Sequence, residues 1–131
     1  MKIVADSNVL LRGIVRDDAR QLAIAHETLG SAQLVAVSTA SLCEVVWVLR
    51  RYKHARSTIA DTIRTLINSA NVVCDRPAVD AGLAALDAGG DFADGVIAHE
   101  GRVLGADTFV SFDKRAVAQI SQTGQVARLL E

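Results

Sequence analysis

Two aspartates of this 131-residue chain stand where an acidic side chain can take part in chemistry. Asp6 follows the short apolar run at residues 2–5, and Asp113 follows the run at residues 108–112. Such runs are typical of buried parallel strands, whose carboxyl ends meet at one edge of a sheet. We therefore expect the two carboxylates to lie at the same edge, although a cap or turn role would explain either one alone.

Glu44 is an acid among apolar neighbours. It lies in the segment Leu42-Cys-Glu-Val-Val-Trp-Val-Leu49, and Trp47 and Val48 come one helical turn after it. A carboxylate in such surroundings is costly unless it is paired, hydrogen-bonded or bound to a cation. The alternatives are a buried ion pair with an arginine and an exposed position on a helix that packs against a partner.

Asp91 and Asp94 are three residues apart at an expected helix start, so both carboxylates point to one side near the positive end of the helix dipole. N-capping explains Asp91 well and Asp94 less well. The acids that would form a site by converging are Asp6, Glu44, Asp94 and Asp113. Four negative charges need shifted pKa values or hard divalent cations with oxygen ligands, which favours Mg²⁺ or Mn²⁺. Such ions activate a water and stabilise the charge that develops on a phosphodiester.

The elements that must position these acids alternate along the chain. Strands are predicted at residues 2–5, 34–37 and 71–74, with one or two more at 103–104 and 108–112. Helices are predicted at residues 19–29, 42–52, 57–68, 77–88, 91–101 and 115–120. This alternation predicts an α/β fold, a three-layer α/β/α arrangement with a central, mostly parallel sheet, formed as a single domain by residues 1–131.

Charge and composition limit the kinds of partner. The chain has 14 basic and 15 acidic residues, a net charge of -1, so it does not bind nucleic acid through bulk positive charge. The densest basic run, at residues 50–56, is typical of a solvated surface and is alternatively a contact for RNA phosphates. The few aromatic residues lie mostly in apolar runs, so no platform for stacking bases is expected.

The remaining features favour a cytoplasmic protein. Cys43 and Cys74 lie in apolar runs without a CxxC pair, as expected of buried thiols in a reducing compartment. The apolar runs fall short of the roughly 20 residues of a membrane span, and an acid comes too early in MKIVAD for a signal peptide.

The segments that hold the acids resemble the four sequence blocks of the PIN-domain ribonucleases. Asp6-Ser-Asn-Val-Leu-Leu11 is similar to their DTNVLL-type opening, and residues 38–44, 91–98 and 108–113 are similar to the other three blocks, in the same order. The resemblance is closest to the bacterial VapC-type toxins, which often carry a DFADALIA-like segment. Gly95 stands where alanine is more usual, and we expect it to loosen the helix by at most about 1 kcal/mol.

This resemblance implies a Mg²⁺- or Mn²⁺-dependent endoribonuclease that hydrolyses RNA phosphodiester bonds and leaves a 3′-hydroxyl and a 5′-phosphate. It implies that the metal-binding and catalytic acids are Asp6, Glu44, Asp94 and Asp113, with Asp91 as an auxiliary acid. The supporting residues are Ser7, Asn8 and Ser111, of which Asn8 is expected to brace Asp6 through its amide.

The same resemblance implies two protein partners, a VapB-type antitoxin and a second copy of the chain in a homodimer. The helices expected between residues 42 and 67 are rich in Val, Leu and Ile, and we expect them to supply the surface for one of these partners.

Two other functions remain open from the residues. One is a PIN-like binding module that has lost its activity. The other is a Mg²⁺-binding receiver-type signalling domain, which normally has an acidic pair near its first strand, whereas Asp6 is followed by Ser7 and Asn8.

Overall fold

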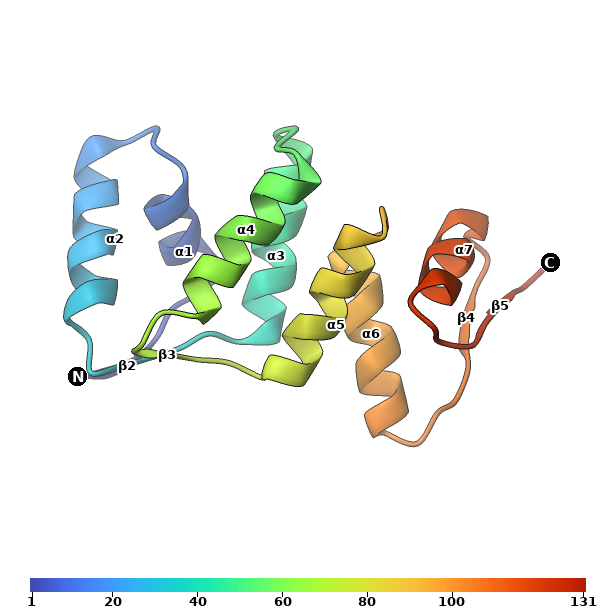
Figure 1. Cartoon of the computed structure of the whole chain (residues 1–131). Coiled ribbons are helices and arrows are strands. Elements are labelled where there is room, and N and C mark those ends of the chain that lie inside the picture. The colour runs from blue at the N-terminus through green and yellow to red at the C-terminus, as the bar shows by residue number, and fades with distance from the viewer. The chain divides into compact units, whose positions relative to one another are not determined.

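The structure, a computed structural model, describes residues 1–131, which Figure 1 traces from blue to red. The chain forms two compact units, unit 1 at Met1–Asp75 and unit 2 at Arg76–Glu131. Both combine helices with parallel strands, so the predicted α/β class, of the three-layer PIN-like kind, is confirmed. That residues 1–131 are a single domain stays a prediction.

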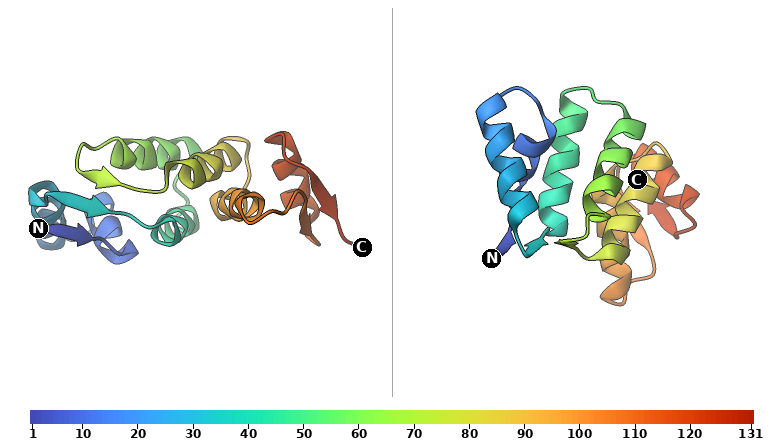
Figure 2. Two further views of the ribbon diagram at one scale, coloured as in Figure 1. Left: turned by 90° about the horizontal axis from the view of Figure 1, so that it is seen from below. Right: turned by 60° about the vertical axis from the view of Figure 1, so that its left-hand side comes forward.

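Unit 1 is built around a three-stranded parallel sheet in the order β1-β2-β3. Its elements are β1 (Lys2–Val4), α1 (Ser7–Ile14), α2 (Ala19–Ser31), β2 (Leu34–Ala36), α3 (Thr39–Arg51), α4 (Arg56–Ile67) and β3 (Val72–Val73). Ile3 pairs with Val35, and Val35 pairs with Val72. Val35 in the middle of this row is fully buried. The strands β1 and β2, blue and cyan in the left view of Figure 2, lie side by side.

The two longest apolar stripes of unit 1 belong to α3 and α4. Their buried side chains are Leu42, Val45, Val46 and Leu49 from α3 and Ile59, Ala60, Ile63 and Ile67 from α4. These side chains belong to the core, so they do not form a spare apolar surface, and that the helices between residues 42 and 67 supply a partner surface stays a prediction.

Unit 2 contains α5 (Arg76–Asp87), α6 (Phe92–Val103), β4 (Phe109–Ser111), α7 (Lys114–Gln122) and β5 (Ala127–Leu129). The two strands pair in parallel, with Val110 opposite Arg128. The predicted buried face of α5 is confirmed, since Val79, Leu83 and Leu86 are all buried. Glycines allow α5 and α6 to approach closely: a Cβ at Gly95 would lie 2.5 Å from the Ala81 carbonyl oxygen.

The predicted elements differ from the structure in three places. Helix α1 was not expected, and its short pattern becomes a helix because Asp6 caps it. Residues 103–104, expected as a strand, are the exposed last residue and C-cap of α6. Strand β5 was also not expected, because three residues near the end of the chain have too little pattern to distinguish a strand from a loop. None of the helices is long and apolar enough to cross a membrane.

Candidate metal-binding and catalytic site

Asp6 lies two residues after β1 and is the N-cap of α1. Its Oδ1 accepts a hydrogen bond of 3.0 Å from the backbone N–H of Val9, which satisfies one of the unpaired donors at the helix start. The side chain is exposed. The cap role that the sequence left open for Asp6 is therefore real, and it uses one of the two carboxylate oxygens.

Glu44 is joined to the same end of α1 by a hydrogen bond. The Ser7 hydroxyl donates to Oε2 of Glu44 at 2.5 Å, which links α1 to α3 within unit 1. Ser7 directly follows Asp6, so this contact places the two acids of unit 1 at one junction between helices. The role of Ser7 as a supporting residue stays a prediction, now with a contact that accounts for it.

The surroundings of Glu44 differ from the expectation. Glu44 is exposed and lies on a stripe of α3 that also exposes Ala40, Trp47 and Arg51. Glu44 has apolar neighbours in the sequence, but Leu42, Val45 and Leu49 point to the buried side of the helix and Glu44 does not. Of the alternatives, the exposed position on a helix is the one the structure contains.

Unit 2 brings three acids near one another. Asp91 is the N-cap of α6 and accepts a 2.7 Å hydrogen bond from the N–H of Ala93, and Asp94 lies in the first turn of that helix. Asp113 is the N-cap of α7, where its Oδ1 accepts from the N–H groups of Arg115 and Ala116 at 2.9 and 3.2 Å. Two helix starts therefore present carboxylates to the same region of unit 2.

Asp94 is the acid that this arrangement perturbs most. Partial burial raises the pKa of Asp94, and the negative charges of Asp91 and Asp113 raise it further. Its carboxylate accepts no hydrogen bond that would stabilise its charge. A cation bound here would stabilise the charged form of the Asp94 carboxylate. Asp94 is therefore the side chain of unit 2 that is best suited to bind a cation.

Ser111 and Asn8 were both expected to support the site. The Oγ of Ser111 accepts a 2.9 Å hydrogen bond from the N–H of Asp113, which fixes the backbone just before α7. Asn8 does not brace Asp6 as expected, because its amide is exposed and the Asp6 side chain bonds to Val9 instead. The helical turn of α1 supplies a nearer donor than the neighbouring amide.

The donor set fits a hard divalent cation in its chemistry. The cap hydrogen bonds of Asp6, Asp91 and Asp113 all end on Oδ1, which leaves Oδ2 of each without a hydrogen bond. Carboxylate oxygens are the ligands that Mg²⁺ and Mn²⁺ prefer. Within either unit, no group of three acidic, histidine or cysteine side chains lies close enough to hold a metal ion.

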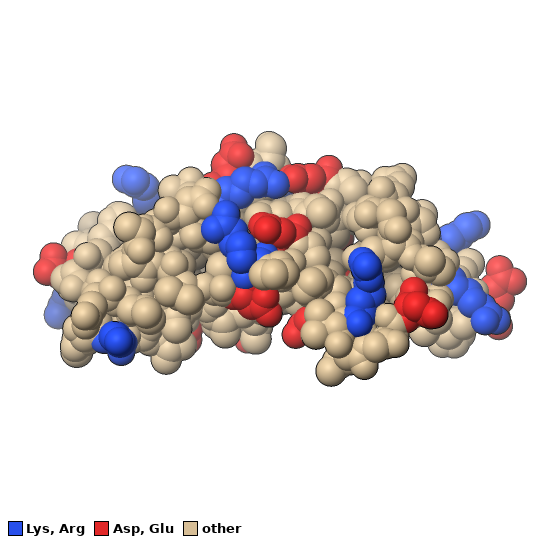
Figure 3. All heavy atoms as spheres, turned by 60° about the horizontal axis from the view of Figure 1, so that its bottom comes forward, with Lys and Arg blue, Asp and Glu red and all other residues tan.

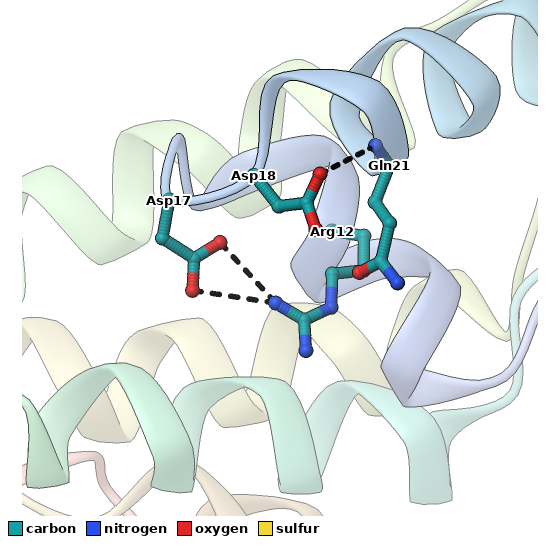
Figure 4. Close-up of polar contacts among 4 residues, drawn as sticks. All are labelled: Arg12, Asp17, Asp18 and Gln21. Carbon is teal, nitrogen blue, oxygen red and sulfur yellow. Dashed lines mark hydrogen bonds and ion pairs between the residues drawn. The ribbon is translucent and has the colours of Figure 1, made fainter.

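Two aspartates near the start of α2 form a helix cap and an ion pair. Figure 4 shows Asp18, the N-cap of α2, accepting a 3.0 Å hydrogen bond from the N–H of Gln21. Beside it, Arg12 bridges both carboxylate oxygens of Asp17 at 3.2 and 3.3 Å. Asp18 thus has the same cap geometry as Asp6 without belonging to the candidate site, which makes it a matched control.

Two aromatic residues of unit 1 are exposed, although the sequence led us to expect no platform for stacking bases. Trp47 and Tyr52 are 61 % and 74 % exposed, and the Arg51 guanidinium lies 5.4 Å from the centre of the Trp47 ring. The missed indication is the spacing: Trp47 and Arg51 are four residues apart, as are cation–π partners along one helix face.

Neither the cavities nor the distribution of surface charge indicates where the candidate metal-binding acids lie. A cavity of about 610 Å³ lies in unit 1 between α1, α2 and α4, and none of the candidate acids lines it. On the face drawn in Figure 3, basic and acidic side chains lie among large uncharged areas, as the net charge of -1 leads one to expect. The aspartates of the candidate site are instead recognised by their places at helix starts, and Glu44, inside α3, by its hydrogen bond from Ser7.

The fold and the acids define a class: an α/β protein in which carboxylates stand at helix starts just after parallel strands. The PIN domain family matches residues 3–121, so the chain belongs to that family. A search of the curated proteins finds no match. Members of the family are generally nucleases that act with divalent metal ions, and the receiver-type alternative is therefore wrong.

Proposed function

We propose that this protein is an endoribonuclease that hydrolyses RNA phosphodiester bonds with bound Mg²⁺ or Mn²⁺. Membership of the PIN family supports nuclease activity in general. The observation that carries the proposal is the group of acids in unit 2, where burial and two neighbouring carboxylates raise the pKa of Asp94. A site that gathers uncompensated negative charge is suited to a cation.

The metal ligands in this proposal are Asp6, Glu44, Asp94 and Asp113, with Asp91 as an auxiliary acid. A bound divalent cation would activate the attacking water and stabilise the charge that develops on the phosphate. The chain itself orients the ligands: backbone N–H groups hold Oδ1 of Asp6 and of Asp113, and Oδ2 of each accepts no hydrogen bond. Ser7 fixes Oε2 of Glu44, and Ser111 fixes the backbone of Asp113.

The biological role that we propose is the toxin of a VapBC-type pair. Its partners are then a VapB-type antitoxin and a second copy of the chain, and it acts in the cytoplasm, where its RNA substrate is found. Support comes from the resemblance of the four acid-bearing segments to the VapC-type toxins.

The decisive experiment measures RNA cleavage by the purified protein with Mg²⁺, with Mn²⁺ and with a chelator. We expect cleavage with either metal and none with the chelator. Asp6→Asn should abolish cleavage, because asparagine keeps the helix cap but removes the charge. Asp18→Asn makes the same change at the α2 cap and should cleave like the wild type.

Equal cleavage by the wild type and Asp6→Asn, with or without metal, contradicts the proposal. Absence of cleavage by a folded, metal-loaded wild type favours the catalytically silent PIN-like module. In cells, the toxin role predicts that expression of the wild type arrests growth and that expression of Asp94→Asn does not.

A further inference from the structure

The exposed stripe of α3 continues past Glu44 toward an aromatic and basic surface. Ala40, Glu44, Trp47 and Arg51 are all exposed and recur at the spacing of one helix face. At 1.5 Å per residue, Trp47 lies about 4.5 Å and Arg51 about 10.5 Å beyond Glu44 along the helix axis. A proposed metal ligand, a large aromatic ring and a cation thus follow one another on a single face.

The exposed indole of Trp47 can stack against a flat ligand. It is 61 % exposed, and the Arg51 guanidinium 5.4 Å from its ring centre extends the surface with positive charge. An exposed indole beside an arginine can stack a base and bind the neighbouring phosphate, as in proteins that bind single-stranded nucleic acid. An apolar protein surface would bind less well here, because it would have to cover the charges of Glu44 and Arg51 on either side of Trp47.

The turn after α3 adds a second, independent observation. Lys53 has a φ of 66°, the left-handed conformation that favours glycine. The turn is otherwise regular: the N–H of Lys53 donates to Arg50 O at 2.9 Å, and the N–H of His54 donates to Leu49 O at 3.0 Å. A lysine at this position costs stability, and its charge adjoins Arg50 and Arg51.

A cavity at the end of α3 provides space beside these cations. It has a volume of about 440 Å³ and is lined by Tyr52 and His54 together with Arg12 and Asn8 of α1. Tyr52 is 74 % exposed, so its ring is accessible to a second base. The volume lies within the range of roughly 300–1,000 Å³ that is typical of ligand pockets.

We propose that the exposed face of α3 and its terminal turn form the binding surface for single-stranded RNA, with a base stacked on Trp47 and phosphates bound by Arg51 and Lys53. This inference rests on the proposed function, since it supplies the RNA that the acids would cleave. The partner is RNA because the surface combines exposed aromatic rings with clustered positive charge next to the candidate site.

Trp47 is the only tryptophan of the chain, so intrinsic fluorescence reports on this surface alone. The probe is a fluorescein-labelled, mixed-sequence single-stranded RNA of about 12 nucleotides, added in chelator so that metal-dependent cleavage does not interfere. Unlabelled RNA of the same sequence should quench Trp47 fluorescence over the concentration range in which the labelled RNA gains anisotropy.

Variants separate the contributions of stacking and charge. Trp47→Ala should weaken RNA binding roughly 5- to 150-fold, whereas Ile24→Ala, which removes another exposed apolar side chain of unit 1, should leave it unchanged. Arg51→Gln should lower the salt dependence of log K by about 0.7, the value for one phosphate contact on a single strand. The matched control is Arg20→Gln, which changes an exposed arginine of α2 outside this surface.

Lys53→Gly tests the strained turn. It should raise the melting temperature, because glycine adopts the positive φ without strain, and at the same time weaken RNA binding. A variant that only damaged the fold would lose both stability and binding.

RNA that binds without quenching Trp47 and that binds Trp47→Ala with unchanged affinity overturns the inference. Metal-dependent cleavage by the same preparation would then leave the proposed function standing. Fluorescence that responds to protein concentration and not to RNA identifies the stripe as a contact between copies of the chain, which also overturns the inference.

Discussion

Aspartates at helix starts have two uses in this protein. Asp6, Asp91 and Asp113 each cap a helix through Oδ1, and the second oxygen of each accepts no hydrogen bond. A cap fixes the orientation of the carboxylate because the helix backbone holds one of its oxygens. Capping and metal binding, which the sequence left as alternatives, are therefore compatible in one side chain.

Asp94 makes the stability of the protein depend on pH. Its pKa in the folded protein is raised above the ordinary 3.8, first by burial and then by Asp91 and Asp113. Its favourable contribution is fully present below pH 3.8 and is lost as the pH rises through the raised value. At pH 7 the charged Asp94 destabilises the folded state.

Asp94→Asn should therefore raise the melting temperature at pH 7 without metal, by about 1–3 °C for a half-buried group, while it abolishes metal-dependent cleavage. The difference from the wild type should vanish near pH 3.5. Asp107→Asn, an exposed aspartate of the same unit, should not change the melting temperature. A lower melting temperature for Asp94→Asn at pH 7 would show that Asp94 is favourable as an ion.

The environment of single side chains was the least predictable from the sequence. The places of Asp6 and Asp113 just after strands could be predicted, because short apolar runs ending in aspartate are local patterns. The exposure of Glu44 and of Trp47 could not, because it depends on which face of α3 turns toward the core of unit 1.

At the scale of elements, the contact between α5 and α6 depends on glycine. A Cβ at Gly95 would lie 2.5 Å from Ala81 O and 2.7 Å from the Cβ of Ala85, and a Cβ at Gly82 would lie 2.7 Å from the Phe92 ring. The sequence suggested that Gly95 merely loosens its helix. The structure shows instead that it permits a close approach of two helices, one of which begins with Asp91 and Asp94.

Gly95→Ala should destabilise the protein by about 1–3 kcal/mol, because overpacking outweighs the helix propensity of alanine. Gly101→Ala lies in the same helix with nothing within 4 Å of its Cβ, and it should stabilise by about 0.5–1 kcal/mol. Unfolding in urea measures both. Equal effects of the two substitutions would contradict the close approach.

Three helices that begin with a side-chain cap were predicted well from the sequence, whereas α1, which Asp6 caps, was not predicted. Asp18, Ser38 and Asp113 cap α2, α3 and α7, whose starts fall within a few residues of the predicted ones. Helix α4 begins without a side-chain cap, and its apolar stripe alone sufficed to predict it. Strand β5 exists only because β4 offers it a partner, which no local pattern reveals.

At the scale of the whole molecule, the proposed metal ligands are two acids of unit 1, Asp6 and Glu44, and two of unit 2, Asp94 and Asp113. Excess Mg²⁺ or Mn²⁺ should therefore raise the melting temperature of the full chain, by an amount equivalent to about 2.7 kcal/mol at 100 times the dissociation constant. Asp6→Asn and Asp113→Asn should each abolish the shift. Asp18→Asn should retain it, because it changes a cap outside the site.

This measurement also tests the prediction of a single domain over residues 1–131. One cooperative transition that the metal shifts as a whole would support it. Two transitions, of which the metal shifts one, would show instead that only one unit holds the ion.

Because β4 pairs with β5, residues 127–129 help to hold the backbone that positions Asp113. Strand β5 is the only strand bonded to β4, and the N–H of Leu130 donates at 2.8 Å to the backbone oxygen of Ser111, the residue whose Oγ accepts from the N–H of Asp113. Substitutions that disrupt β5 would therefore loosen β4, and with it the backbone that positions Asp113, without changing any acid.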